Sequence, residues 1–342
     1  MTEKRIAVDV MGGDFAPRVA IEGISLALDA FPDVNITGIG HLQKIAHYLE
    51  AYGLTDHPRL SLIHAENVVE MHEPATMALR GKKNSSISIA AKLMKQGKID
   101  ALFTAGHTGA AVAAHTVLTR TLPGVDRPAI TTLLPGQDGH FILADAGANV
   151  ECKPHNLAQF ALMAETYSSF MFGIENPRIG LLSVGGEDGK GNDLTKEAFK
   201  ILEKMQINFI GNVEGNTIFE NIADVVVCDG FTGNVVLKTA EGLSKATNKW
   251  MKDAFSKNAF RMTGAMLAKN AFRDLKGICD AEEFGGAPLL GINGICLIGH
   301  GSSSSKSFLN GIKSVSEMLY FGANEKITAK IKQLNMLINE NE

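Results

Sequence analysis

Short apolar runs rich in β-branched residues alternate with helical patterns along nearly the whole chain, and this alternation is the feature that most constrains the fold. The first run, residues 6–10, is followed by a loop containing two glycines and then by a helical pattern from about residue 16 to residue 30. Repeated strand–helix units build a mostly parallel sheet with helices on both of its faces. The sequence therefore predicts an α/β fold.

Nine further strands are expected along the chain. They lie at residues 34–39, 60–64, 101–104, 129–134, 141–144, 179–184, 208–211, 225–228 and 295–298. With the first run, these are too many for one compact sheet, so we expect a two-lobed layout. No long linker, internal repeat or low-complexity segment divides the chain, and we treat residues 1–342 as one large α/β unit with an active-site cleft.

A polar loop with four glycines follows the strand expected at residues 179–184. These glycines are Gly185, Gly186, Gly189 and Gly191. Glycine permits positive φ and a close backbone approach to a ligand, so successive N–H groups can point at an anion. Asn192 or Asp193 can cap the next helix, and Lys190 adds a full positive charge. The loop suits a phosphate-like ligand, while the alternative is an ordinary strand–helix connection with a solvated lysine.

Similar loops follow other expected strands, at residues 11–14, 105–109, 145–149, 229–234 and 299–304. In open α/β sheets, ligands bind beyond the carboxyl ends of the strands. Six such loops at equivalent ends of one sheet predict a cleft lined with backbone donors. His107 is the best candidate for a functional imidazole in these loops, although a lone histidine is often structural. The serines at residues 302–305 are placed to grip an anion.

A basic segment precedes a helix expected to start near Ile87. It contains Arg80, Lys82 and Lys83, and Ser85 or Ser86 would cap the helix. The segment can bind phosphate or the acidic face of a carrier protein, or it can be a solvated surface turn.

Several classes of protein are disfavoured. A net charge of −4 without a basic tract argues against nucleic acid as the main partner. No HExxH motif occurs and the histidines are scattered, so no metal is expected. The Walker A, dinucleotide and GxSxG patterns all fail on inspection.

The four cysteines form no CxxC pair, as expected for reduced thiols in the cytoplasm. The amino terminus lacks a signal peptide pattern, so we expect a soluble protein that at most touches a membrane surface.

Residues 242–276 break the alternation, because their pattern is helical throughout. Eight Lys or Arg residues outweigh two Asp residues there, and Gly264 offers a possible bend. The apolar side of these helices includes Met262, Met266 and Leu267. A basic amphipathic helix pair can lie on an anionic membrane or contact a partner, and the alternative is that its apolar face joins the core or a dimer interface.

Seven ordered motifs, spread over nearly the entire chain, resemble those of the bacterial phosphate acyltransferase family. They are MGGDFAP at residues 11–17, TAGHTGA at 104–110, GVDRPAI at 124–130, DAGAN with CKP within 145–154, KGN at 190–192, DGFTGNVVLK at 229–238 and GHGSS at 299–303. One departure is Gly186, where the family usually has an acidic residue.

The resemblance implies a three-layer α/β/α fold similar to phosphotransacetylases and isopropylmalate dehydrogenases. It also implies a homodimer that transfers a fatty acyl group from acyl carrier protein to inorganic phosphate, without metal or organic cofactor. The product, an acyl phosphate, would serve a membrane glycerol-phosphate acyltransferase in phospholipid synthesis. The helical insert at residues 242–276 would correspond to the projecting helices that the family uses for dimer and membrane contact.

The residues expected to act fit this chemistry, since a phosphate oxyanion needs to be held and aimed rather than deprotonated. We expect Lys190 to hold the phosphate charge, Asn234 to donate to the carbonyl oxygen or sulfur, and His107 to assist as a donor. Further substrate-binding candidates are Gly185, Gly189, Asn192, Asp229, Gly233, Gly301, Ser302, Ser303, Arg80 and Lys83. Two rival hypotheses remain, namely a dehydrogenase of the related fold and a noncatalytic adaptor for a membrane or a carrier protein.

Overall fold

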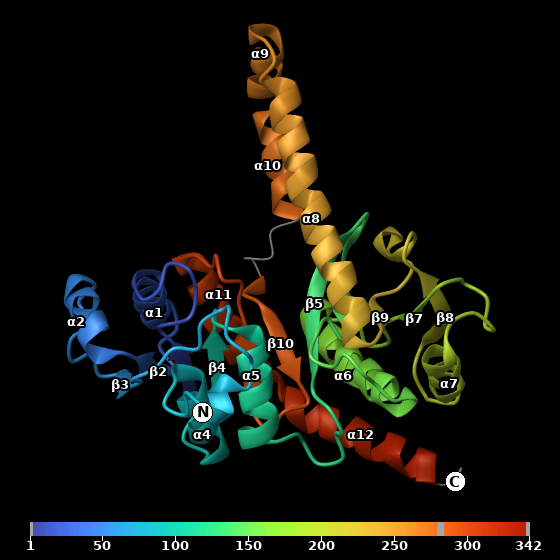
Figure 1. Cartoon of the computed structure of the whole chain (residues 1–342), viewed down its shortest axis with the longest axis horizontal. Helices are drawn as coiled ribbons and strands as arrows, with labels where there is room; N and C mark the ends of the chain where they lie inside the picture. Colours follow the sequence, from blue (N-terminus) through green and yellow to red (C-terminus); the bar gives the residue numbers. More distant parts are fainter. Residues whose placement is uncertain (1–2, 279–283, 340–342) are drawn as a thin grey trace.

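The computed structural model describes residues 3–278 and 284–339, in which one large sheet is flanked by helices on both faces (Figure 1). The eleven strands follow the order β3-β2-β1-β4-β11-β10-β5-β6-β9-β7-β8. Their bounds are β1 Lys4–Asp9, β2 Val34–Gly40, β3 Leu60–His64, β4 Ala101–Thr104, β5 Ala129–Gly136, β6 Gly139–Ala144, β7 Ile179–Ser183, β8 Phe209–Glu214, β9 Val225–Val227, β10 Ala287–Leu290 and β11 Ile295–Ile298. The predicted α/β/α architecture is confirmed.

The sheet consists of two parallel groups of strands joined by antiparallel ones. Strands β3, β2, β1, β4 and β11 form the first group, and β6, β9, β7 and β8 form the second. Between them, β11, β10, β5 and β6 pair antiparallel at every step. The expectation that the strands were too many for one sheet is therefore wrong, because β10 joins the two halves. The sequence pattern does not predict this strand, because its four residues include Pro288 and follow two glycines.

Helices cover each face of the sheet. One face carries α1 Arg18–Ala30, α2 Leu42–Ala51, α6 Pro154–Phe172, α7 Asp193–Leu202, α11 Ser305–Phe321 and α12 Ala323–Asn339, whose apolar residues join the largest core cluster. The other face carries α3 Met77–Arg80, α4 Ser86–Lys95 and α5 Thr108–Ala114 over the first group of strands. Residues 218–223 and the first turns of α8 cover the second group on that face.

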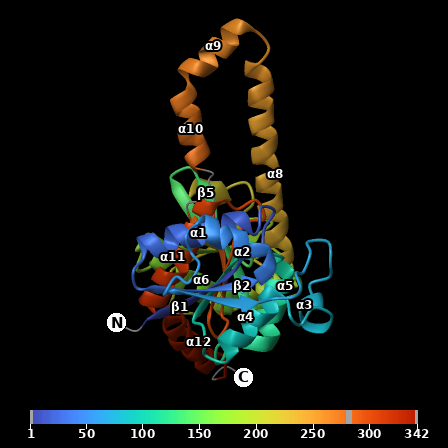
Figure 2. The same ribbon diagram turned by 90° about the vertical axis from the view of Figure 1, so that its left-hand side faces the viewer.

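The helical insert forms a hairpin that projects from the body (Figures 1 and 2). It comprises α8 Gly230–Phe255, α9 Ala259–Leu267 and α10 Lys269–Ile278. Helix α8 starts at Gly230, twelve residues before the expected insert, but its first turns pack on the body and only its later part projects. The chain turns at residues 256–258 and at Ala268, whereas Gly264, the expected bend, lies inside α9. Asn258 caps α9 by accepting a bond from Arg261 N.

Two of the predicted helix caps are confirmed. The Ser85 side chain accepts from Ser88 N at the start of α4, and that of Asn192 accepts from Thr195 N at the start of α7. Of the cysteines, Cys228 and Cys296 are buried and Cys152 is partly buried, while Cys279 lies outside the described residues. No helix in the described part of the chain has the length and apolar character needed to cross a membrane.

Candidate functional site

A cavity of about 250 Å³ lies where the loops after β1, β4 and β11 meet the start of α4. Its lining includes Gly12, Ser86, Gly106, His107 and Gly301. Hydrogen bonds connect these loops. Asp14 N donates to Gly301 O at 2.7 Å, which joins the loop after β1 to the loop after β11. Three of the predicted glycine loops therefore do line one hollow.

Asp9 lies at the base of this cavity and was not among the predicted site residues. Its carboxylate accepts bonds from Thr104 Oγ1 at 2.8 Å and from Met11 N at 3.1 Å. Burial raises its pKa, and hydrogen bonds from Ser86, Thr104 and the backbone oppose that shift. A charged residue inside the apolar run IAVDV was the signal that could have identified it. With its oxygens satisfied, Asp9 anchors the loops around the cavity.

His107 lines the cavity, and both of its ring nitrogens have partners. Nδ1 accepts from Ala110 N at 3.2 Å, so the ring caps α5, and Nε2 lies 2.9 Å from Glu73 O. Since Nδ1 accepts, Nε2 carries the proton and donates to the Glu73 carbonyl. In this position the imidazole holds residues 70–75 against the loop, and its catalytic role stays a prediction.

The loop after β11 places its predicted residues differently. Gly301 lines the cavity, whereas Ser302 Oγ lies 2.8 Å from His300 Nδ1 on the exposed side. Ser303 is buried and donates its N–H to His300 O at 2.9 Å. The cap of α11 is Ser304, which forms a reciprocal capping box with Ser307.

A second cluster forms at the ends of β6, β9 and β7, with Asp145 at its centre. This buried carboxylate accepts N–H bonds from Ile130, Gly147, Ala148 and Asn149 at 2.7–3.1 Å. The Asn149 amide adds a bond of 2.8 Å to the same carboxylate. Burial raises the pKa of Asp145, whereas these hydrogen bonds lower it. Because the carboxylate is buried and already accepts these bonds, it organises the loop and is not exposed to a ligand.

Asn234 lies in the first turn of α8, beside this cluster. Asp229 caps α8 by accepting from Thr232 N and Thr232 Oγ1, at 2.9 and 2.8 Å. Gly233 packs so tightly that an added Cβ would lie 1.9 Å from Asp145 O. The expectation that Asp229 orients its neighbours agrees with these bonds, and the close packing fixes where Asn234 stands.

Lys190 lies in the loop after β7, which is the strand next to β9. Because β7 and β9 are parallel, Lys190 and Asn234 follow the carboxyl ends of adjacent strands. Lys190 is exposed, and its aliphatic chain lies over the buried Gly185. Within residues 3–278 and 284–339, no hydrogen bond or ion pair engages its ammonium group. Gly189 is exposed, and Asn192 caps α7 as described above.

We expected all six glycine loops at equivalent ends of one sheet, and this expectation is wrong. The strands that carry them run in opposite senses in the two parallel groups, because three antiparallel pairings separate β11 from β6. Both clusters nevertheless adjoin the same face of the sheet. Ala148 and Leu237 of the second cluster pack against the core cluster that contains Ala110 and Ala111 of α5.

The remaining predicted residues lie outside both clusters. Arg80 and Lys83 are exposed at the end of α3 and in the turn before α4. Met262, Met266 and Leu267 lie in α9, at the tip of the projecting hairpin, where they are 48%, 72% and 85% exposed. The apolar side of the insert tip therefore does not join the core of this chain.

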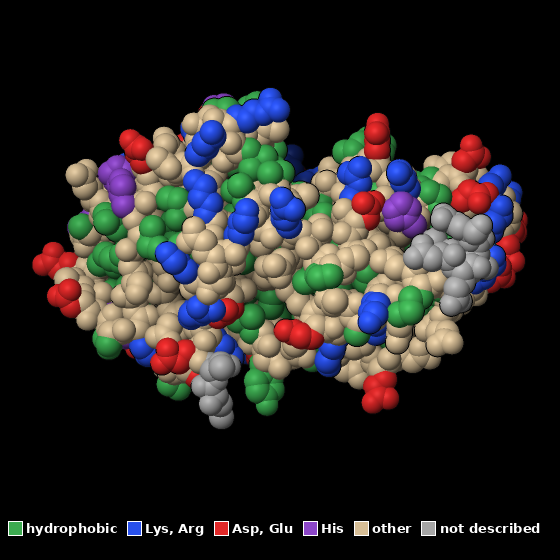
Figure 3. Space-filling view, turned by 90° about the horizontal axis from the view of Figure 1, so that it is seen from below, with side chains coloured by type: hydrophobic (Ala, Val, Ile, Leu, Met, Phe, Trp, Pro, Cys, Tyr) green, Lys and Arg blue, Asp and Glu red, His purple; other side chains and the backbone are tan. Residues whose placement is uncertain are grey.

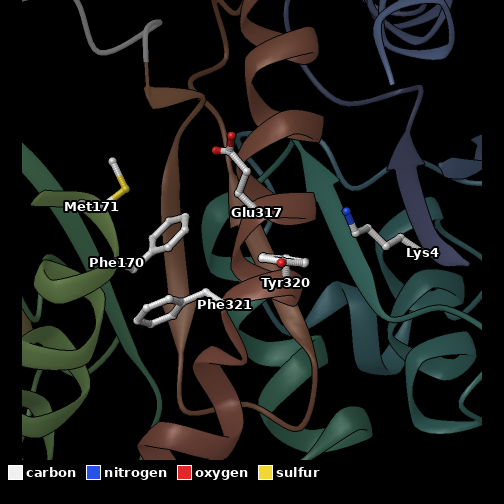
Figure 4. Close-up of a pocket in the computed structure, with 6 residues that line it drawn as sticks. All are labelled: Lys4, Phe170, Met171, Glu317, Tyr320 and Phe321. Carbon is white, nitrogen blue, oxygen red and sulfur yellow. The ribbon is translucent and has the colours of Figure 1, made fainter. Parts of the chain in front are cut away.

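A larger, open hollow of about 670 Å³ lies between α6, α11 and the start of β1 (Figure 4). Its lining consists of Lys4, Phe170, Met171, Glu317, Tyr320 and Phe321. None of the residues predicted to act is among them. No three His, Cys, Asp or Glu side chains in the described ranges are grouped as metal ligands would be.

Two solved structures share the arrangement of the whole chain. A phosphotransacetylase from Streptococcus pyogenes has a TM-score of 0.59 at 16% identity, with 93% of this chain and 94% of that chain covered. The EutD phosphotransacetylase from Staphylococcus aureus has a TM-score of 0.58 at 18% identity, with 92% and 94% covered. At such identities the likeness shows the fold alone.

Sequence comparison identifies much closer relatives. Residues 4–326 match the family described as "Fatty acid synthesis protein". A phosphate acyltransferase from Thermodesulfovibrio yellowstonii is 46% identical over 333 residues, which cover 96% of this chain and 94% of that protein. One from Acidobacterium capsulatum is 43% identical over 325 residues, covering 95% and 96%. The chain is therefore an acyltransferase and belongs to the phosphate acyltransferases of the fatty acid synthesis protein family, as its motifs predicted.

Proposed function

We propose that this enzyme transfers a fatty acyl group from acyl carrier protein to inorganic phosphate, forming an acyl phosphate for phospholipid synthesis. The observation that carries the proposal is the position of Lys190 and Asn234 at the ends of adjacent parallel strands, with the Lys190 ammonium unpaired. An unpaired cation beside glycine loops and helix N-termini suits a small dianion. An amide that follows the neighbouring strand suits the polarised carbonyl of a thioester.

In the proposed reaction, a phosphate oxygen attacks the thioester carbonyl carbon directly. A carbon–oxygen bond forms, the tetrahedral oxyanion collapses, and the carbon–sulfur bond breaks. The thiolate leaves on the carrier and then takes a proton from water. A thiol with a pKa near 8.5 is a good leaving group, so little acid catalysis is needed. No covalent enzyme intermediate is required, because phosphate is already nucleophilic.

The protein's part is to bring two reactants together and to stabilise the developing charge. Orientation of bound reactants can supply roughly 7 to 11 kcal/mol of the barrier. A preorganised donor at the oxyanion supplies about 2.7 to 4 kcal/mol. We assign Lys190 to phosphate charge and Asn234 to the oxyanion or sulfur. Gly185, Gly189 and Asn192 supply the rest of the anion loop. His107 and Gly301 line the cavity on the same face of the sheet, and Ser303 is buried behind them.

The projecting hairpin supports a role at the membrane surface. Its tip exposes Phe260, Met266 and Leu267, with Arg261 and Lys269 nearby. Apolar side chains beside basic ones favour an anionic lipid interface. We propose that the enzyme is cytoplasmic and attaches peripherally through this tip, close to the membrane glycerol-3-phosphate acyltransferase that would consume its product.

The shaft of the hairpin supports a homodimer. Phe231, Val235, Leu243 and Trp250 of α8 are all exposed large apolar residues. Their spacing places them along one side of the helix. Such a stripe is stabilised by burial against a second copy, which would leave the tips of both hairpins free to meet lipid.

The proposed reaction can be tested with purified protein, palmitoyl carrier protein and labelled phosphate. Acyl phosphate is trapped as its hydroxamate with hydroxylamine, which requires no assumption about the site. Formation of palmitoyl hydroxamate that depends on both phosphate and enzyme is the expected result. Its absence, under conditions where the thioester stays intact, would reject the proposed reaction.

A further inference from the structure

Basic residues are concentrated in one part of a chain whose net charge is negative. Residues 74–125 contain seven Lys or Arg residues and a single acidic residue, Asp100, although the chain as a whole carries −4. Asp100 is neutralised by Arg5, with an Nη2–Oδ1 distance of 2.5 Å, and Lys82 is paired with Glu73 at 2.7 Å. The other six cations have no acidic partner among the described residues.

These six cations define what we call the basic face: Arg80, Lys83, Lys92, Lys95, Lys98 and Arg120. Five of them are exposed, and Lys92 is partly exposed. Lys92 Nζ donates to Lys83 O at 2.7 Å, which joins α4 to the turn before it. Figure 3, seen from the side opposite the hairpin, shows Lys and Arg side chains gathered on the left-hand half of the molecule.

An apolar residue stands beside these charges. Val117 belongs to the π-helical turn His115–Thr119 and is 55% exposed. The turn is attached to α4 through a bond from Thr119 Oγ1 to Ala91 O at 3.2 Å. A single exposed valine is ordinary on a protein surface, so the concentration of unpaired cations carries the argument.

The basic face begins at the rim of the cavity. Ser86 and Ile87, the first residues of α4, line the cavity together with His107. Lys92 and Lys95 lie in the last turns of the same helix, and Lys98 follows it. The basic face thus runs from Lys83, just before the cavity-lining start of α4, to Lys95 and Lys98 about 14 Å farther along the helix, so its near end adjoins the cavity.

We propose that the basic face is the docking surface for the acidic carrier protein that delivers the acyl group. This inference rests on the proposed function and names the surface that its protein substrate uses. A carrier docked along α4 can pass a flexible thioester arm into the cavity. Complementary charge accelerates such an encounter without requiring tight binding, which suits a substrate that must leave after each turnover.

A membrane is the other anionic surface that such cations can meet. The geometry favours the carrier, because Figure 1 shows α9, which carries the exposed apolar tip of the hairpin, at the opposite end of the molecule from α4. A membrane that receives this tip cannot also reach the basic face. The two surfaces then serve two partners at once.

The test compares two acyl donors that differ only in the carrier protein. The variant is Lys92→Glu/Lys95→Glu/Lys98→Glu, and the donors are palmitoyl carrier protein and palmitoyl-pantetheine. The matched control is Lys196→Glu/Lys200→Glu/Lys204→Glu, which makes the same charge change on exposed lysines in and just after α7. We expect kcat/KM for palmitoyl carrier protein to fall at least about tenfold in the first variant only. The value for palmitoyl-pantetheine should stay within about twofold.

An equal loss with both donors, or no loss with either, would overturn the proposal. Thermal unfolding checks that the variant is folded, and Lys92→Gln/Lys95→Gln/Lys98→Gln provides a milder version if it is not. If the unaltered enzyme makes acyl phosphate from neither donor, the proposed function fails. The docking surface is then judged by direct binding.

Direct binding uses fluorescently labelled carrier protein, with anisotropy measured at low and high salt. Salt-sensitive binding that the first variant loses and the control keeps would support the docking surface without any turnover. Equal binding by both variants would overturn it. Loss of binding to phosphatidylglycerol vesicles, with carrier binding intact, would assign the basic face to lipid and also overturn the proposal.

Discussion

The Asn234 side chain lies against the backbone of Gly147, so that a Cβ atom added to Gly147 would stand 3.4 Å from Asn234 Oδ1. Gly147 has a φ of +135°, which side chains with a Cβ rarely adopt. The loop after β6 therefore leaves room for the amide that we assign to the oxyanion. A side chain at Gly147 would strain the backbone, while its Cβ would meet Asn234 at ordinary van der Waals distance.

The first prediction concerns this pair. Asn234→Ala should lower kcat by about a hundredfold or more, because one preorganised donor is lost. Gly147→Ala should also lower kcat, because relief of the strained φ at residue 147 would shift the loop that contacts Asn234 without removing the amide. Both are measured by hydroxamate formation at saturating donor and phosphate. Full activity in both variants would remove Asn234 from the mechanism.

Lys190→Ala should reduce turnover at limiting phosphate by about two orders of magnitude, the effect of losing one electrostatic contact. Lys190→Arg, which keeps the charge, should recover part of this loss through a lower KM for phosphate. The control is Lys196→Ala, because Lys196 is an exposed lysine of the following helix. Unchanged turnover in Lys190→Ala would exclude Lys190 as the phosphate ligand.

How far the sequence predicts the site is seen by comparing Lys190 with Asp9. The glycine loop around Lys190 follows an apolar β-branched run. Both signals are local, so the sequence is sufficient to predict a strand followed by a glycine loop at this place. Asp9 accepts from Thr104, 95 positions away, and such a contact is set by strand pairing rather than by any pattern near Asp9. His107 was recognised from its loop, yet its bond to Glu73 O could not be foreseen.

The same distinction applies to the fold. Alternating runs predict parallel strands with helices between them, and most strands lie where the sequence places them. The antiparallel pairing of β10 with β11 is local, but its pairing with β5 is not, because it joins residues 287–290 to residues 129–136 across most of the second half of the chain. Without β10, the two parallel groups cannot be joined, and their opposite senses cannot be deduced.

The third prediction uses two glycines of one helix. Gly→Ala within a helix normally stabilises by about 0.5–1 kcal/mol. Gly242→Ala should follow this rule, since nothing lies within 4 Å of an added Cβ. Gly233→Ala should instead destabilise by about 1–3 kcal/mol, because its Cβ would meet Asp145 O. Urea unfolding of both variants measures the difference, and the same sign in both would contradict the packing described here.

The fourth prediction concerns His115, which is buried with Nδ1 beside Thr119 Oγ1 and no partner for Nε2. Burial lowers its pKa from 6.5 to about 4. Between these values the unfolded chain binds a proton that the folded protein excludes, so the free energy of unfolding falls as pH is lowered. The expected loss from pH 8 to pH 5 is about 2 kcal/mol.

His115→Phe removes the titrating group and should make the loss between pH 8 and pH 5 smaller by that amount. The comparison is between the two pH values within each protein, so that any change in overall stability cancels. Chemical unfolding at both pH values gives the four free energies needed. An identical pH dependence in the two proteins would mean that the His115 environment is not as described.

The last prediction separates membrane attachment from catalysis. Met262, Met266 and Leu267 are exposed at the hairpin tip, so replacing them with Gln or Ser costs the fold little. Full burial of one such side chain contributes about 1.5–3 kcal/mol, and partial insertion of all three should still contribute about 1.5 kcal/mol or more. Sedimentation with phosphatidylglycerol liposomes should therefore weaken at least about tenfold. Hydroxamate formation in solution should not change, because the tip lies far along the hairpin from the glycine loops (Figure 1).

The matched control replaces Met71 and Val150, which are exposed apolar residues of the body, and should sediment normally. If the tip variant sediments as well as the unaltered protein, the membrane contact belongs to another surface.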